Sequence, residues 1–413
     1  MSSEFIFYII IVLFVWEFIL SKVLDYLNTK NWTNQLPKEL EWIYDEEKYK
    51  KSMEYEKAKY KFSSITWIFT FIIMLLVLVF WWFWFLDDFV RNLSDNNILR
   101  ALYFFWIIAF VQTIISLPIS YYSTFVIEEK FGFNKMNKKL FFIDTLKTFI
   151  LTIIIWWLLL ALIVWLYELN QNSFWFYTWI VMTVFSVFMM MFYSSLIVPL
   201  FNKQTLLEDW ELRTTIEDFA NKVWFKLDNI YVIDWSKRSS KANAYFSGFW
   251  PKKRIVLYDT LIKDLTTKEL VAVLAHEIGH YKRKHTLQML VFSIIQTGFM
   301  LFILWLTLKY SEVSEALWAK QGSFWVWVVA FWILFTPISI ILWLLWNVLS
   351  RKNEYQADEF SWENYDIESL KSALIKLSRN NLSNLRPHPV YEFFHYSHPT
   401  VLKRLKALDN LKK

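Results

Sequence analysis

The sequence predicts an all-α polytopic membrane protein that carries a small α+β domain on one side of the membrane. Of the 413 residues, 56% are hydrophobic and 21% are aromatic, a composition that is not expected of a soluble multidomain protein. Seven apolar stretches are each long enough, at about 20 residues, to cross a bilayer. A polar segment between the fifth and sixth stretches contains strand-like runs, which account for the β part.

The predicted transmembrane spans cover residues 4–27, 63–86, 101–126, 145–168, 174–200, 285–309 and 324–349. The first span begins almost at Met1, without a basic region or a small-residue cleavage site, so we expect a retained helix rather than a signal peptide. The spans divide the chain into four parts: five transmembrane helices with their loops in 1–200, a polar segment in 201–284, two further transmembrane helices in 285–350 and a polar tail in 351–413.

Lysine and arginine are concentrated in alternate loops of this chain. The loops after the first and third spans are rich in lysine, whereas the loops after the second, fourth and sixth spans contain few cations. Because cytoplasmic loops carry an excess of lysine and arginine, we expect the segment 201–284 and the tail to be cytoplasmic. The same bias explains the net charge of +6 and the pI near 9.0, so no nucleic-acid partner is expected.

The segment 276–280, His-Glu-Ile-Gly-His, has the spacing of a zinc-binding helix. Positions i and i+4 lie on one helix face, so His276 and His280 can bind one metal ion while Glu277 serves as general base toward a metal-activated water. The run from Thr266 to Glu269 has the form of a capping box, which predicts where this helix begins. The chain has no cysteine, so any metal ligands must be His, Asp or Glu.

The polar tail contains a carboxylate pair at helical spacing. Glu354 and Asp358 lie four residues apart, and hence on one face of a helix. Catalytic zinc usually has three protein ligands, and two histidines with one glutamate are a standard set. We therefore expect one zinc ion per chain, bound by the two histidines of the motif and Glu354. Asp358 is placed to accept a hydrogen bond from the second nitrogen of a ligand histidine.

The polar segment before the motif has a mixed pattern. Residues 211–223 predict a polar helix, and 230–233 and 254–258 predict two strands. Between the two strands, residues 239–246 predict a third, exposed strand.

Several blocks of the sequence, in order, resemble the type I CAAX prenyl protease family of membrane zinc endopeptidases. The matching blocks are residues 128–134 (EEKFGFN), 199–201 (PLF), 236–240 (SKRSS), 243–245 (NAY), 253–261 (KRIVLYDTL), the zinc motif, 354–358 (EYQAD) and 395–399 (HYSHP). The resemblance implies seven helices around a large water-filled chamber, with a zinc metalloprotease domain at its cytoplasmic end.

The resemblance also implies roles for residues outside the zinc motif. Asn243 and Ala244 fall in the family's edge strand, which holds the backbone of an extended substrate. His398 and Arg404 match residues near the site of cleavage, and His398 is a suitable donor to the oxyanion of the tetrahedral intermediate. The remaining histidines are expected to be structural: His285, His388 and His395.

The predicted function is that of an integral-membrane zinc metalloendopeptidase that hydrolyses peptide bonds by zinc-activated water. The expected partners are membrane lipid and a peptide or protein substrate, prenylated at its C-terminus if the resemblance extends so far, and the expected state is a monomer. The expected location is the bacterial inner membrane, or the endoplasmic reticulum if the source is eukaryotic. Two alternatives remain open: an HtpX-like quality-control protease and a non-catalytic zinc-binding or transport protein.

The numbers of glycine and tryptophan are unusual. Average glycine usage of about 7% would give roughly 29 glycines in this length, whereas the chain has 5 Gly and 25 Trp. Several tryptophans fall where the family pattern has glycine or a turn: Trp210, Trp224, Trp235, Trp250 and, as a further candidate, Trp362. One hypothesis is that a codon translated here as Trp, with UGA as the candidate, is read as Gly in a bacterial source. The alternative is a membrane protein that is naturally rich in tryptophan.

Overall fold

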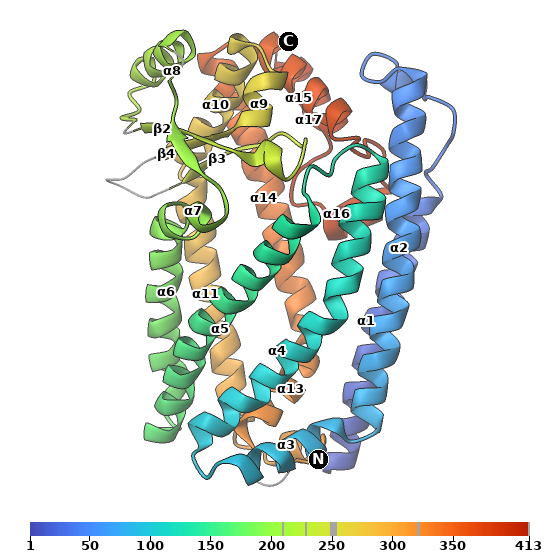
Figure 1. Cartoon of the computed structure of the whole chain (residues 1–413), viewed down its shortest axis with the longest axis vertical. Coiled ribbons are helices and arrows are strands. Elements are labelled where there is room, and N and C mark those ends of the chain that lie inside the picture. The colour runs from blue at the N-terminus through green and yellow to red at the C-terminus, as the bar shows by residue number, and fades with distance from the viewer. Residues whose placement is uncertain (209, 228, 248–253, 320–322, 412–413) are drawn as a thin grey trace.

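The computed structural model describes residues 1–208, 210–227, 229–247, 254–319 and 323–411. Long helices form one part of the molecule, and a mixed domain covers one end of them (Figure 1). The long helices and their connections are α1 (Ser3–Thr29), α2 (Glu46–Val79), α3 (Trp82–Leu93), α4 (Asn97–Tyr122), α5 (Lys138–Leu169), α6 (Phe174–Leu196), α11 (His285–Thr307), α12 (Glu312–Glu315), α13 (Phe324–Leu334) and α14 (Thr336–Asn364).

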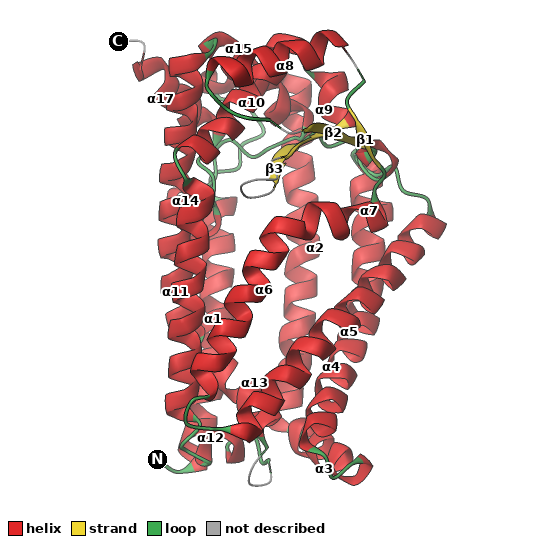
Figure 2. Cartoon of the chain, turned by 90° about the vertical axis from the view of Figure 1, so that its left-hand side faces the viewer, coloured by secondary structure: helices red, strands yellow, loops and turns green. Residues whose placement is uncertain are grey.

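The covering domain is built from two separate stretches of the chain. The first provides α7 (Val198–Phe201), β1 (Gln204–Leu206), α8 (Trp210–Lys222), β2 (Asn229–Ile233), β3 (Ala244–Ser247), β4 (Arg254–Tyr258), α9 (Asp259–Asp264) and α10 (Thr267–Lys282). The second provides the end of α14 together with α15 (Ile367–Asn380), α16 (Pro389–His395) and α17 (Val401–Leu411). Figure 2 shows the strands between the helices of this domain and the membrane-spanning helices.

Six helices are long and apolar enough to cross a membrane, and α13 with α14 makes a seventh span if the pair is counted as one. The expectation of seven spans is therefore confirmed in number, but two of them differ in detail. The second ends at Val79 rather than at residue 86, because Trp81, in the left-handed conformation, separates α2 from α3. The seventh bends by 58° between α13 and α14, because Pro337 lacks the N–H that a continuous helix needs.

The interior face of α1 is packed at its ends but not at its middle. Ile10 and Leu24 are buried at 0% and 4% exposure. Glu17 lies seven residues from each, on the same helix face, yet it is exposed. An ionisable side chain that faces inward and stays accessible favours the water-filled chamber that the family resemblance implies.

A buried carboxylate joins helices at the end of the molecule opposite the sheet. Asp87 on α3 is fully buried and accepts hydrogen bonds from Ser323 Oγ at 2.8 Å and Trp325 Nε1 at 2.9 Å. Arg91 pairs with the same carboxylate at 3.1 Å. A buried charge is tolerated only with such compensation, so this cluster fixes α3 against the start of α13.

The sheet has the strand order β1-β2-β4-β3. β2 and β4 are parallel, and β1 and β3 are antiparallel to their neighbours. The strand expected at 239–246 is shorter and later, at Ala244–Ser247, and a 3₁₀ turn at Trp235–Lys237 precedes it. β3 is an edge strand, so one side of its backbone is not paired within the sheet.

Three of the five described non-glycine residues with positive φ are tryptophans: Trp81 (58°), Trp224 (53°) and Trp318 (59°). Glycine adopts this left-handed conformation without steric cost, whereas for other residues it is unfavourable. Trp224 is also 90% exposed. Among the other tryptophans of the recoding hypothesis, Trp210 begins α8, Trp235 begins the 3₁₀ turn, Trp362 lies within α14, and Trp250 lies outside the described residues.

Candidate active site

The zinc motif lies on α10, and the start of this helix is fixed as the sequence predicts. Thr266 and Glu269 form the capping box, and the Glu269 carboxylate also accepts hydrogen bonds from Ser372 at 2.6 Å and Lys376 at 2.7 Å on α15. Burial opposes ionisation, but the bonds from Lys376, Ser372 and Thr266 outweigh it and lower the pKa of Glu269 to about 2. The carboxylate therefore stays charged and ties α10 to α15.

A glycine allows α10 and α14 to approach closely. A Cβ added at Gly279 would lie 3.1 Å from the Ala357 carbonyl oxygen and 3.1 Å from the Phe360 side chain, which is tighter than ordinary contact. Ala275 and Ala357 are both fully buried nearby. Small residues on both helices thus bring the histidines of α10 to the carboxylates of α14.

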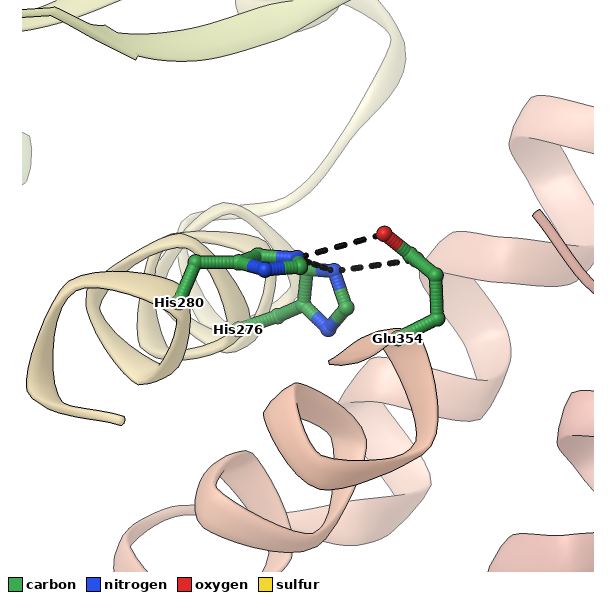
Figure 3. A group of neighbouring side chains, drawn as sticks. All are labelled: His276, His280 and Glu354. Atoms are coloured by element: carbon green, nitrogen blue, oxygen red, sulfur yellow. Dashed lines mark hydrogen bonds and ion pairs between the residues drawn. The ribbon is translucent and has the colours of Figure 1, made fainter. Parts of the chain in front are cut away.

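The predicted ligands converge on one point between the two helices (Figure 3). One ligand atom from each of His276, His280 and Glu354 lies within 4.8 Å of the others. The Nε2 atoms of the two histidines are 3.1 Å apart, and they lie 3.5 Å and 3.3 Å from the oxygens of the Glu354 carboxylate. Two imidazoles and one carboxylate, all turned toward a shared centre, fit a catalytic metal site that leaves one position open.

A buried ionic network holds the other nitrogen of His276. Its Nδ1 lies 2.9 Å from Asp358 Oδ1, and Arg404 donates from Nε to Asp358 Oδ2 at 2.8 Å. Burial and the charge of Arg404 oppose protonation, but the bonds to Asp358 and Glu354 raise the pKa of His276 to about 9. Asp358 lies where the sequence places it. Arg404 is 8% exposed and also pairs with Glu354 at 3.3 Å, so its guanidinium contacts one predicted ligand and the carboxylate that supports another.

His285, which was expected from the sequence to have only a structural role, contacts the predicted ligand His280. The Nδ1 of His285 lies 3.1 Å from Nδ1 of His280, and its Nε2 lies 2.9 Å from Oε1 of Gln356. Lys284, in the left-handed conformation at φ 59°, separates α10 from α11 and turns His285 back toward the motif. The signal in the sequence was a third histidine only five residues after the second.

The remaining predicted site residues line one cleft with the ligands. This cleft has a volume of about 450 Å³, and apart from Asp358 all the predicted site residues line it: Asn243, Ala244, His276, Glu277, His280, Glu354, His398 and Arg404. Its apolar wall comes from Leu261, Val273, Leu370, Leu374 and Leu377. The Nε2 of His398 lies 3.3 Å from Glu354 Oε1, and its side chain is 64% exposed. The predicted general base, the predicted oxyanion donor and the start of the edge strand therefore line the same cleft as the predicted metal ligands.

Two ion pairs, neither of which the sequence predicted, attach the segment before β3 to the long helices. Lys241 Nζ lies 2.8 Å from Glu128 Oε2 and donates to Tyr55 Oη at 2.9 Å. Arg238 donates from Nε to Asp144 at 2.8 Å. Both cations lie within six residues of the cleft-lining Ala244, so the membrane helices position the edge strand.

Comparison with known proteins covers nearly the whole chain. Residues 25–203 match the family described as CAAX prenyl protease N-terminal, five membrane helices, and residues 206–412 match peptidase family M48. The chain belongs to peptidase family M48. It is therefore a membrane metallopeptidase, and the expected fold class, family and enzyme class are confirmed.

Similar proteins include CAAX prenyl protease 1 of Saccharomyces cerevisiae, 36% identical over 91% of this chain and 88% of the yeast protein. The mouse CAAX prenyl protease 1 homolog is 31% identical over 92% of this chain and 90% of that protein. The crystal structure of S. mikatae Ste24p superposes with a TM-score of 0.93 at 33% identity, covering 99% of both chains. Both the membrane helices and the covering domain thus follow a known architecture.

Proposed function

We propose that the metal is a single zinc ion bound by His276, His280 and Glu354, and that the chain uses it to hydrolyse peptide bonds within the cleft that these residues line. The observation that carries this proposal is that the ligand set, Glu277 and the edge strand all line one cavity. When bound, zinc polarises a water molecule and the scissile carbonyl. Glu277 is placed to accept the proton of that water and to transfer it to the leaving amine.

Further residues of the cleft bind and orient the substrate in this proposal. The unpaired edge of β3, beginning at Ala244, adds the extended substrate as a further strand. His398 approaches from the side of Glu354 and donates a hydrogen bond to the oxyanion. The leucine wall accommodates apolar side chains next to the scissile bond.

Substitution of Glu277 tests the assigned base. The Glu277→Gln variant should keep zinc, because Glu277 is not a ligand, and lose about 10²-fold or more of its peptidase activity, because the proton acceptor is gone. Zinc content by atomic absorption and cleavage of a peptide by mass spectrometry measure the two outcomes. Glu211→Gln, on the exposed face of α8, is the matched control. Full activity in purified Glu277→Gln protein, with contaminating proteases excluded, would overturn the assignment.

The proposed substrate is a polypeptide with a processed C-terminus, by analogy with the relatives named CAAX prenyl protease 1. A source without protein prenylation would favour an HtpX-like role, in which membrane or stalled polypeptides are degraded. The match of residues 25–203 to the five-helix family favours processing of a C-terminus over the HtpX-like role. Trapping substrates on the Glu277→Gln variant in its own cells distinguishes the two by the mass of the bound C-termini.

The proposed orientation places the protease domain in the cytoplasm, because the lysine-rich loops lie on its side of the bundle. The chain has no cysteine, so the single substitutions Lys139→Cys and Asp95→Cys each introduce one site for a thiol reagent. In sealed membranes, Lys139→Cys should be labelled from the cytoplasmic side and Asp95→Cys from the opposite side. Labelling of both from the same side would contradict this topology. The bacterial inner membrane and the monomeric state remain predictions, which fractionation and light scattering of the purified protein would test.

A further inference from the structure

A second cavity lies between the start of α11 and the middle of α14. Its volume is about 450 Å³, and the contact between His285 and Gln356 joins the same two helices. None of the ligands or cleft residues named above lines it. It is therefore separate from the active-site cleft, although His280 in the lining of the cleft contacts His285 in the lining of this cavity.

The polar part of this cavity is cationic. Arg283, Lys284 and Lys352 line it, and none of the described residues that line it carries a carboxylate. Arg283 pairs with Glu359 at 3.0 Å, whereas Lys284 and Lys352 have no ion pair among the residues that the structure describes. Both lysines are exposed, so two positive charges at this cavity are not neutralised by the described part of the protein.

Uncharged donors accompany these cations. Asn353 lines the cavity and is 3% exposed, and its side-chain Nδ2 finds no hydrogen-bond partner in the described part of the chain. A buried amide without a partner is costly. The first turn of α11, which starts at His285 in the cavity lining, has no side-chain cap, so its first N–H groups are not satisfied by a capping residue. Cations, a free amide and a helix start together are suited to bind an anion.

The other part of the cavity is apolar and continues into an exposed apolar surface of the same two helices. Leu287 and Val291 line it at 39% and 46% exposure. Beyond them Ile295 on α11 is 63% exposed, and Leu345 and Val348 on α14 are 52% and 47% exposed. Because both helices cross the membrane, the donors lie where the hydrocarbon-facing belt ends. A soluble anion without acyl chains would make no favourable contact with the apolar half of the cavity.

We propose that this cavity binds the headgroup of an anionic phospholipid. The phosphate lies between Lys284 and Lys352, with the Asn353 amide as a third donor, and the acyl chains run along Leu287 and Val291. Basic pockets between transmembrane helices recognise lipid headgroups in this way. The bound lipid touches the wall that contains His285, and hence the support of the metal ligand His280.

Binding can be measured without proteolysis, so a failure of this proposal and a failure of the proposed peptidase mechanism are distinguishable. The full-length protein, purified in detergent, is titrated with phosphatidylglycerol or phosphatidylcholine, and bound lipid is counted by native mass spectrometry. Phosphatidylglycerol should bind and phosphatidylcholine should not. Equal binding of the two lipids would overturn the proposal.

The two free lysines provide the decisive variant. Lys284→Gln with Lys352→Gln should weaken phosphatidylglycerol binding about 30-fold, which corresponds to roughly 1 kcal/mol for each basic residue at a membrane surface. Lys135→Gln with Lys139→Gln removes the same charge from another exposed site and should leave binding unchanged. An equal loss of phosphatidylglycerol binding in both double variants would mean that the lipid is attracted by net charge alone, and it would contradict a specific site.

Two further measurements distinguish a lipid site from misfolding of the variant and from a site for a soluble anion. The Lys284→Arg, Lys352→Arg variant keeps the charge and should bind as the parent does, which separates lost contacts from misfolding. Inorganic phosphate and glycerol phosphate should compete at least 10-fold more weakly than the lipid, because they cannot use Leu287 and Val291. Competition as strong as that of the lipid would make this a site for a soluble anion and would overturn the lipid assignment.

Discussion

The two histidines of the zinc motif lie on one helix, yet their surroundings differ. On one side, His276 is buried at 7% exposure and rests on the charged pair of Asp358 and Arg404. On the other side, His280 rests on His285 and Gln356, which are uncharged partners next to a cationic cavity. We therefore expect the first arrangement to stabilise both the fold and the bound metal, and the second to stabilise the bound metal with little effect on the fold.

The largest loss of stability and of zinc affinity is expected when the charged partners of His276 are changed. Asp358→Ala leaves the buried Arg404 without its main partner, so the free energy of unfolding should fall by about 3–5 kcal/mol and zinc affinity by about 10–100-fold. Thermal unfolding with and without a chelator, together with competitive zinc titration, measures both. Glu359→Ala at the next position should cost less than about 1 kcal/mol. If the two variants behaved alike, the network would not support the site.

A smaller effect is expected on the side of His280. His285→Phe keeps an aromatic ring but removes the bond to Nδ1 of His280, so zinc affinity should fall about 10-fold while the unfolding temperature of the metal-free protein stays close to that of the parent. His395→Phe, which lies outside the lining of both cavities, is the control for loss of an imidazole. Unchanged zinc affinity in His285→Phe would show that the contact does not support the ligand. A large loss of metal-free stability would remove the contrast between the two sides.

The same contrast explains what the sequence could predict. Helical spacing places His276 and His280 together, and a carboxylate at i+4 from Glu354 predicts the role of Asp358, because both inferences need only one helix at a time. His285 follows Lys284, which has the left-handed conformation. Such a break changes the direction of the next side chain, and the periodicity of the sequence does not show it. Arg404 was expected near the substrate, and it lines the cleft. Its buried guanidinium also needs carboxylates, and those of Asp358 and Glu354 come from a helix that a single sequence does not place beside it.

The bend before α14 and the ion pairs that attach β3 were missed for a related reason. Apolar length identifies the span at 324–349, but the angle at Pro337 depends on what α13 packs against. Lys241 and Arg238 lie in a polar loop, where a cation is ordinary, and their partners Glu128 and Asp144 are about a hundred residues away. Contacts between distant segments leave no pattern in a single sequence.

The smallest effect tests whether some tryptophans occupy glycine positions. Trp179 is half-buried, its Nε1 donates to the Ile294 carbonyl at 2.8 Å, and its ring fills the space beside Gly298. Trp224, by contrast, is 90% exposed and left-handed. Trp224→Gly should therefore raise the free energy of unfolding by about 1 kcal/mol, whereas Trp179→Gly should lower it by several kcal/mol. Chemical denaturation of the two purified variants measures both changes.

The recoding hypothesis predicts the same division in the protein isolated from its own source. Peptide mass spectrometry should find glycine at Trp81, Trp224 and Trp318, where the backbone has positive φ, and tryptophan at Trp179, where the ring is packed and bonded. Intact tryptophan at Trp235 and Trp250 in the native protein would contradict recoding. In that case the left-handed tryptophans would be a steric cost that this protein carries, and Trp224→Gly would still measure that cost at one position.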